Sequence, residues 1–168
     1  ARQQIEARDP VDLASGLDLL GNILFAEIGG AMGPLYGSLF MAMAEPARDK
    51  TEIDRETFGA MLNAALEAVQ ALGEAKVGDK TLIDTLAPAC EAYNAAIADD
   101  SSFADALASM ATAAEAGKES TRDLVAKVGR SSRLGERSRG HLDAGATSCY
   151  LILKSLADSI TELLRPED

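Results

Sequence analysis

The chain has 168 residues, of which 47% are hydrophobic and only 4% aromatic, and it contains no tryptophan. This length suits one domain, and a core of alanine, leucine, isoleucine, valine and methionine favours closely packed helices over sheets. The formal net charge of −11 argues against nonspecific binding to nucleic acid or to an anionic membrane surface.

Cys90 and Cys149 stand alone, without the spacing of a disulfide framework. We interpret them as small buried hydrophobic residues of a protein in a reducing compartment. The sequence has no apolar run of about 20 residues that could cross a membrane, and no recognisable signal peptide. We therefore expect a soluble, cytoplasmic single domain that spans residues 1–168.

Apolar residues recur every three to four positions along most of the chain, which predicts a succession of helices. No segment alternates between apolar and polar residues over the length of a strand, and no internal repeat is present. The predicted helices cover residues 11–28, 35–44, 54–72, 80–98, 103–128 and 147–163. We expect an all-α fold in which antiparallel helices with short connections form an up-and-down bundle or barrel.

Prolines and aspartates mark several predicted helix ends. Pro34 suits the first turn of the second helix, and Pro46 should follow the end of that helix. Asp54 and Asp79 are placed to cap the helices that follow them. Pro88 should bend or interrupt the helix predicted over residues 80–98.

Three glycine-bearing junctions, residues 29–37, 73–81 and 129–148, each connect one predicted helix to the next. Successive junctions are separated by a pair of helices, so in an up-and-down bundle all three emerge at the same end. Free backbone N–H groups at such junctions can bind an anion. We therefore predict that the three junctions converge at one mouth of the bundle.

The junction at residues 129–148 is basic in an otherwise acidic chain. It contains four arginines, four glycines, the carboxylate Asp143 and the only histidine, His141. A helix start attracts anions through its dipole and free N–H groups, and arginine adds bidentate contacts to phosphate. This pattern predicts contact with a phosphate or nucleotide. The alternative is a solvated loop in which Asp143 only caps the last helix.

Three segments closely resemble the nucleotide-binding L subunit of dihydroxyacetone kinases, in the order of that family: residues 29–37 (GGAMGPLYG), 77–82 (VGDKTL) and 129–148 (GRSSRLGERSRGHLDAGATS). The resemblance implies an antiparallel eight-helix barrel that holds ATP or ADP with magnesium at one end. A separate K subunit would hold the triose covalently through a histidine, and the phosphoryl group would pass in line to the triose hydroxyl. In phosphotransferase-dependent members, an M subunit would rephosphorylate the bound ADP.

The resemblance also assigns nucleotide contacts in the first two segments. Ala31 and Met32 would lie beside the nucleotide phosphates, although many relatives have serine where this chain has Met32. Gly73 and Leu82 would line the adenine and ribose region.

In the third segment, the resemblance implies that Arg130 contacts the nucleotide and that Asp143, Ala144 and Gly145 form a backbone wall against it. His141 belongs to the same motif, and we interpret it as a structural hydrogen-bonding residue.

Three further arginines in this segment have open roles: they could face the nucleotide, dock an acidic surface of a partner subunit, or pair with local carboxylates such as Glu136. We expect at least two of them to pair with local carboxylates. They are Arg133, Arg137 and Arg139. No residue is assigned as a catalytic nucleophile, because the implied mechanism needs only positioning and electrostatic stabilisation.

The family also has a Gly-Asp-x-Asp-His-Gly loop after an N-terminal helix, and its aspartates hold two magnesium ions. No such motif occurs in this sequence, so no metal ligand is assigned. Phosphoryl transfer depends on magnesium to neutralise developing charge. We therefore expect that a segment of the natural protein lies outside this chain, and that the chain alone does not catalyse phosphoryl transfer.

Other functions fit the same resemblance. The acceptor could be another short ketose such as a tetrulose, or a fatty acid held by another protein. A non-catalytic alternative is a nucleotide-sensing bundle that binds a regulator.

Overall fold

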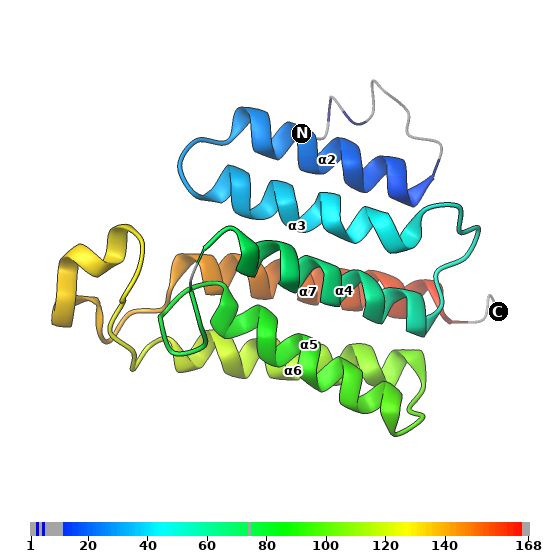
Figure 1. Cartoon of the computed structure of the whole chain (residues 1–168). Coiled ribbons are helices and arrows are strands. Elements are labelled where there is room, and N and C mark those ends of the chain that lie inside the picture. The colour runs from blue at the N-terminus through cyan, green and yellow to red at the C-terminus, as the bar shows by residue number, and fades with distance from the viewer. Residues whose placement is uncertain (1–2, 4, 6–11, 74, 166–168) are drawn as a thin grey trace. The chain divides into compact units, whose positions relative to one another are not determined.

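The computed structural model describes residues 3, 5, 12–73 and 75–165 of the chain. The ordered elements in this part of the chain are all helices, without a strand, so the predicted all-α fold is confirmed (Figure 1). None of these helices is both long enough and apolar enough to cross a membrane. Contacts divide the chain into two compact units, Ala1–Glu74 and Ala75–Asp168. A single domain over residues 1–168 stays a prediction.

The first unit contains α2 (Leu13–Glu27), α3 (Met32–Ala47) and α4 (Arg55–Ala71). In this unit α3 packs against both α2 and α4. The predicted cap at Asp54 is confirmed, because its carboxylate accepts the N–H of Thr57 at 2.7 Å and so begins α4.

Glycines let α2 and α3 approach each other closely. A Cβ atom at Gly37 would lie 2.8 Å from Cβ of Phe25 and 2.9 Å from the carbonyl oxygen of Gly21. A Cβ atom at Gly33 would collide with the carbonyl oxygen of Ile28, just after α2. These contacts fix the start of α3 against the end of α2, and with it the first glycine-rich junction.

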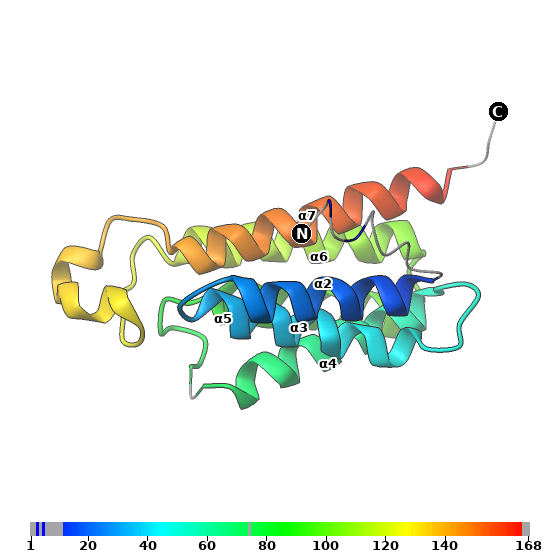
Figure 2. The same cartoon turned by 90° about the horizontal axis from the view of Figure 1, so that it is seen from above.

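The second unit contains α5 (Ile83–Ala98), α6 (Phe103–Ser120), the 3₁₀ segment η1 (Arg130–Ser138) and α7 (Ala144–Leu163). Each of α5, α6 and α7 packs against the other two, and η1 lies beyond the ends of α6 and α7 (Figure 2). Both cysteines are buried, as predicted. The large side chains that α5, α6 and α7 bury include Leu86, Cys90, Tyr93, Leu107, Met110, Cys149 and Leu153.

Two prolines lie inside helices rather than at their ends. The structure extends α3 from Met32 to Ala47, so the prediction that this helix ends before Pro46 is wrong. Near the end of a helix a proline removes few hydrogen bonds, so the last turn still forms. Pro34 lies in the first turn of α3, as predicted. Pro88 does not interrupt α5.

The predicted start of α5 is wrong, because the helix begins at Ile83 and Asp79 does not cap it. Lys80 has a φ of 63°, which a right-handed helix excludes. Asp79 instead accepts the N–H of Lys76 at 2.8 Å and pairs with Lys127 at 3.1 Å. The hydrogen bond from Lys76 and the pair with Lys127 lower the pKa of the Asp79 carboxyl.

The predicted end of α6 is also wrong, since the helix stops at Ser120 rather than at Val128. The segment that follows makes contacts elsewhere in the second unit. The N–H of Ala126 donates to the hydroxyl of Ser138 at 2.9 Å, and the N–H of Lys127 donates to the carbonyl of residue 79 at 3.1 Å. These two bonds take the place of the backbone hydrogen bonds that Ala126 and Lys127 would form within α6 if the helix continued to Val128.

Candidate functional site

The first glycine-rich junction leaves the start of α3 without a side-chain cap. Gly30 has a positive φ of 73°, and it leads into Ala31, the N-cap residue. Among the described residues, no side chain forms a capping hydrogen bond here, and the first turn carries no acidic residue. Ala31 and Met32 are exposed. The backbone at this helix start can therefore receive an anion such as phosphate.

The buried carboxylate of Asp84 holds the backbone of the second junction through two hydrogen bonds. Its side chain is almost fully buried, with 2% of the residue exposed. One carboxylate oxygen accepts the N–H of Gly78 at 2.6 Å, and the other accepts the N–H of Thr81 at 2.7 Å. Leu82, which follows directly, is itself buried, so a ligand can reach its backbone more easily than its side chain.

Lys80 joins three separate backbone segments of the second unit. Its ammonium group donates to the carbonyl oxygens of Leu124 at 3.1 Å, Ser138 at 2.6 Å and His141 at 2.6 Å. The residue is only 4% exposed. The lysine of the Gly-Asp-Lys-Thr segment therefore positions the third junction rather than extending toward a phosphate.

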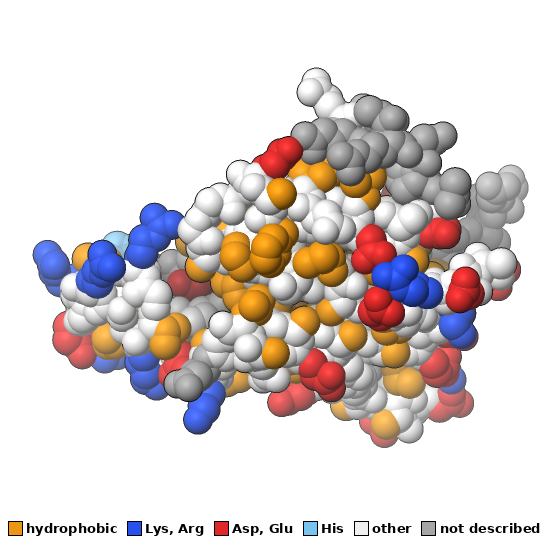
Figure 3. Space-filling view, turned by 45° about the horizontal axis from the view of Figure 1, so that its top comes forward, with side chains coloured by type: hydrophobic (Ala, Val, Ile, Leu, Met, Phe, Trp, Pro, Cys, Tyr) orange, Lys and Arg blue, Asp and Glu red, His pale blue; other side chains and the backbone are white. Residues whose placement is uncertain are grey.

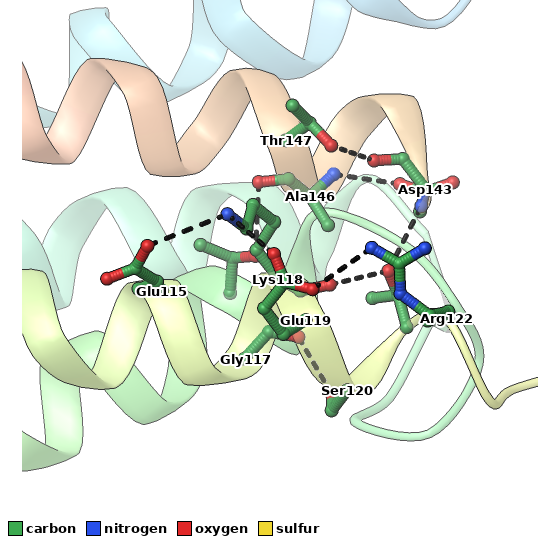
Figure 4. A network of polar contacts seen from close by, with 11 residues as sticks. Glu115, Gly117, Lys118, Glu119, Ser120, Arg122, Asp143, Ala146 and Thr147 are labelled. Carbon is green, nitrogen blue, oxygen red and sulfur yellow. Dashed lines mark hydrogen bonds and ion pairs between the residues drawn. The ribbon is translucent and has the colours of Figure 1, made fainter. Parts of the chain in front are cut away.

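Asp143 caps α7, as one of the two sequence interpretations predicted (Figure 4). Its carboxylate accepts the N–H of Ala146 at 2.8 Å, and its carbonyl accepts the hydroxyl of Thr147 at 2.7 Å. Its own N–H donates to the hydroxyl of Thr121 at 3.0 Å. Burial raises the pKa of the Asp143 carboxyl above its ordinary value, and the nearby Asp84 carboxylate adds to this effect.

The second and third junctions lie together, as predicted. A Cβ atom at Gly145 would lie 3.4 Å from the backbone nitrogen of Leu82, so the start of α7 packs against the second junction. The hydroxyl of Thr85 also donates to the carbonyl of Ala146 at 3.1 Å. Ala144, the first residue of α7, is exposed. Within the second unit, the backbone of Leu82 and the backbone wall of residues 143–145 therefore adjoin each other.

A charged network lies at the end of α6, close to the α7 cap (Figure 4). Lys118 pairs with Glu119 at 2.9 Å, and its ammonium group lies 4.4 Å from the centre of the Tyr150 ring. The hydrogen bond to Glu119 is the main cause that raises the pKa of Lys118. Arg122 pairs with the same Glu119 at 3.3 Å. The network ties α6 to α7 beside the Asp143 cap.

The arginines of η1 differ in their contacts. Arg139 pairs with Glu136 at 3.0 Å and donates to the carbonyl of Asp123 at 2.5 Å, as the local-pairing alternative predicted. Arg130, Arg133 and Arg137 are exposed, and within the described part of the chain none of their side chains has a hydrogen-bond or ion-pair partner. The prediction that at least two of Arg133, Arg137 and Arg139 pair locally is therefore wrong, because among the described residues Glu136 pairs with Arg139 alone.

Two other predicted site residues are exposed. His141 contributes only its carbonyl, which accepts the Lys80 bond, and its ring has no partner among the residues that the structure describes. The prediction that its ring is a structural hydrogen-bonding group is therefore wrong. Gly73 has open space around it. Gly73 and the α3 start belong to the first unit, so the convergence of all three junctions stays a prediction.

Sequence reasoning missed the residues that position this site. Lys80 and Asp84 were not recognised as buried, and Thr121 was placed inside a longer helix. Only Asp84 gave a sign of burial in the sequence, because it lies in a mostly apolar run between Ile83 and Leu86.

The described residues offer no cluster of three or more His, Cys, Asp or Glu side chains that could hold a metal ion. The two neighbouring carboxylates, Asp84 and Asp143, already accept backbone N–H groups. Because these carboxylates are already taken by backbone donors, they do not fit magnesium, which is bound through one or two carboxylates together with phosphate and water.

Comparison with known proteins identifies the family. The model of the DAK2 domain matches residues 1–158. The chain is 39% identical over 155 residues to the ADP-binding subunit DhaL of PEP-dependent dihydroxyacetone kinase 2 of Listeria innocua, covering 89% of this chain and 68% of that protein. It is 34% identical over 146 residues to the corresponding DhaL subunit of Escherichia coli, covering 87% of this chain and 70% of that protein.

A third relative is the D-erythrulose kinase of Mycolicibacterium smegmatis, which is 36% identical over 147 residues. That match covers 88% of this chain but only 25% of the larger protein. The chain therefore belongs to the DAK2 domain family, which it shares with the DhaL-type subunits of dihydroxyacetone kinases.

Proposed function

We propose that this chain is the ADP-binding, DhaL-type subunit of a dihydroxyacetone kinase. The observation that carries the proposal is its identity of 34–39% to DhaL subunits over 87–89% of the chain. Those relatives are named as ADP-binding subunits of PEP-dependent kinases. A cytoplasmic location, and a phosphoryl donor that reaches the bound ADP through an M subunit, belong to the same proposal.

In this proposal the nucleotide is bound mainly by backbone groups. The uncapped start of α3 supports a phosphate contact at Ala31 and Met32, because its N–H groups and helix dipole favour an anion. Arg130 is exposed and has no partner among the described residues, so its guanidinium is free for bidentate contact with phosphate. Gly73 is proposed to line the adenine and ribose region.

In the second unit, Leu82 is proposed to line the adenine and ribose region, and the segment 143–145 is proposed to form the backbone wall against the nucleotide. Gly145 supports close backbone approach, since a Cβ atom there would lie 3.0 Å from the Asp143 carboxylate and 3.4 Å from the nitrogen of Leu82. Lys80 and Asp84 hold these segments in place from within.

Catalysis would come from positioning the phosphoryl group toward an acceptor sugar on a separate K subunit. The chain needs no nucleophile, because N–H groups and Arg130 stabilise the charge that develops on the phosphates. Magnesium belongs to the family chemistry, but the described carboxylates do not supply its ligands, so no step of this proposal passes through them.

A tetrulose is the second candidate acceptor. It is favoured by the relative named D-erythrulose kinase, at 36% identity. The main proposal remains dihydroxyacetone, because that sugar is named in the relatives that this chain covers over more than two thirds of their length. The relatives compared above give no support to a fatty acid acceptor or to a nucleotide sensor.

Titration calorimetry with ADP and magnesium tests the proposal, with Arg130→Ala as the variant and Arg165→Ala as the matched control. Arg165 follows the end of α7, is exposed and lies at the opposite end of that helix from residues 143–145. We expect the wild-type chain to bind ADP. We expect Arg130→Ala to weaken binding about tenfold, because one charge-assisted contact is lost. Absence of ADP binding by the wild-type chain, or equal weakening by both variants, would contradict the proposal.

A further inference from the structure

Two fully buried threonines hold the backbone at the start of α7. Thr85 lies on α5 and Thr121 directly follows α6, and each is 0% exposed. The hydroxyl of Thr121 accepts the N–H of Asp143 at 3.0 Å, and the hydroxyl of Thr85 donates to the carbonyl of Ala146 at 3.1 Å. The two hydroxyls therefore bond the backbone on both sides of residues 144–145.

The hydroxyl of Thr121 is fixed in its direction. It donates to the carbonyl of Lys118 at 2.7 Å, so its single proton is used and a lone pair is left for the N–H of Asp143. The bond from Thr85 is an additional one, because the carbonyl of Ala146 also lies within the regular hydrogen-bond pattern of α7. This extra bond fixes the direction of the first turn of α7.

The two threonines belong to helices that are in direct backbone contact. A Cβ atom at Gly117, one turn before Thr121, would collide with the carbonyl oxygen of Asp84, the residue before Thr85. On the other side, the ammonium group of Lys118 lies 4.4 Å from the centre of the Tyr150 ring of α7. Close-packed helices of this kind transmit small displacements, so the start of α7 is held by a stiff support.

The backbone between these two bonds is the segment 143–145, which is proposed to form the wall against the nucleotide. Figure 3 shows basic side chains gathered over the η1 segment, at the left of the view. Exposed arginines can attract an anion, but their long side chains lose rotamer freedom when they bind. A backbone wall that buried hydroxyls fix in advance loses little conformational entropy on binding. The threonines thus supply what the exposed arginines cannot.

We propose that Thr85 and Thr121 are positioning residues for the nucleotide, and that they set ADP affinity by fixing residues 143–146. Both are fully buried, so they act through this backbone and do not touch the ligand. This inference rests on the proposed function. A supporting contact that lets a binding segment shift by about 1 Å is enough to weaken a site.

The test is titration calorimetry of the full chain with ADP and magnesium. Thr121→Val and Thr85→Val remove each hydroxyl and keep the shape of the side chain, whereas Thr121→Ser and Thr85→Ser keep the hydroxyl. Thr57→Val is the matched control. Thr57 is 8% exposed, its side chain bonds the Asp54 carboxylate, and it lies in the first turn of α4, at the opposite end of that helix from Gly73.

The valine variants should weaken ADP binding and the serine variants should restore it. We expect Thr121→Val to weaken binding about tenfold, because the N–H of Asp143 loses its acceptor, and Thr85→Val to weaken it about threefold. We expect both serine variants to stay within about twofold of wild type, since the hydroxyl is kept. Thr57→Val should lower the melting temperature through its lost bond but leave ADP affinity within about twofold of wild type.

The comparison of affinity with melting temperature separates positioning from a general loss of stability. The inference is overturned if the valine variants bind ADP as wild type does, if the serine variants weaken binding as much as the valine variants, or if Thr57→Val weakens it as much as Thr121→Val. If Thr121→Val does not fold by circular dichroism, Thr85→Val decides, because it leaves no backbone group without a partner. Absence of ADP binding by the wild-type chain overturns the proposed function instead.

Discussion

Asp143 has two effects on stability that oppose each other at neutral pH. Its carboxylate caps α7 through the 2.8 Å bond from Ala146, which stabilises the helix. Burial, helped by Asp84, raises the pKa of its carboxyl above the ordinary value of 3.8. The folded state therefore binds the proton more tightly than the unfolded state. The stabilisation that comes from this tighter proton binding is full below pH 3.8, and it is lost as the pH rises through the raised pKa of the folded state.

Two substitutions at this position separate the cap from the charge. We expect Asp143→Asn to keep a capping oxygen without the buried charge, so its free energy of unfolding relative to wild type should rise between pH 4 and pH 8. We expect Asp143→Ala to lose the cap as well and to be about 1 kcal/mol less stable than Asp143→Asn at all these pH values, because neither variant titrates at this position. Urea unfolding across this pH range measures both effects. A pH-independent difference between Asp143→Asn and wild type would contradict the assignment.

At the scale of elements, Lys80 determines how the loop after α6 and the η1 segment are placed. Its ammonium group satisfies three carbonyls at 2.6–3.1 Å, from residues 44 to 61 positions away in the sequence. We expect Lys80→Met to destabilise the chain by about 2 kcal/mol or more, because buried carbonyls are left without a donor. Hydrogen exchange should quicken over residues 121–141, while α5 and α7 stay protected.

Lys80→Arg is the control for this prediction. A guanidinium group keeps several donors and a positive charge, so we expect it to retain much of the protection over residues 121–141. If Lys80→Met left exchange in this segment unchanged, the segment would be held by its other bonds, such as the one from Ala126 to Ser138.

Helix ends were predictable from the sequence where the signal is local. Asp54 caps α4 through a residue only three positions away, which the sequence pattern indicates directly. The start of α5 was not predictable, because its N-cap residue, Leu82, forms no side-chain cap and so gives no local signal. The left-handed backbone of Lys80 keeps Asp79 out of the helix, and the contacts of Lys80 are with distant segments.

At the scale of the whole molecule, the helix order predicted that the second and third junctions meet, and the structure places Gly145 against Leu82. The polar groups that hold them together were not predictable. A buried Lys80 or Thr121 looks like any surface lysine or helix-end threonine until tertiary contacts are known. The resemblance predicted which loops contact the nucleotide, whereas the buried residues that hold these loops were found only in the structure.

The last prediction concerns how the chain unfolds. Its two compact units, Ala1–Glu74 and Ala75–Asp168, are each small, and domains of such size bury too little surface to be very stable alone. We therefore expect one cooperative unfolding transition for the full chain, with equal calorimetric and van't Hoff enthalpies. ADP at about 100 times its dissociation constant should add about 2.7 kcal/mol to the stability of that single transition. Differential scanning calorimetry measures this directly. Two resolved transitions, of which ADP shifts only one, would instead show that the units fold independently and that one unit binds the nucleotide by itself.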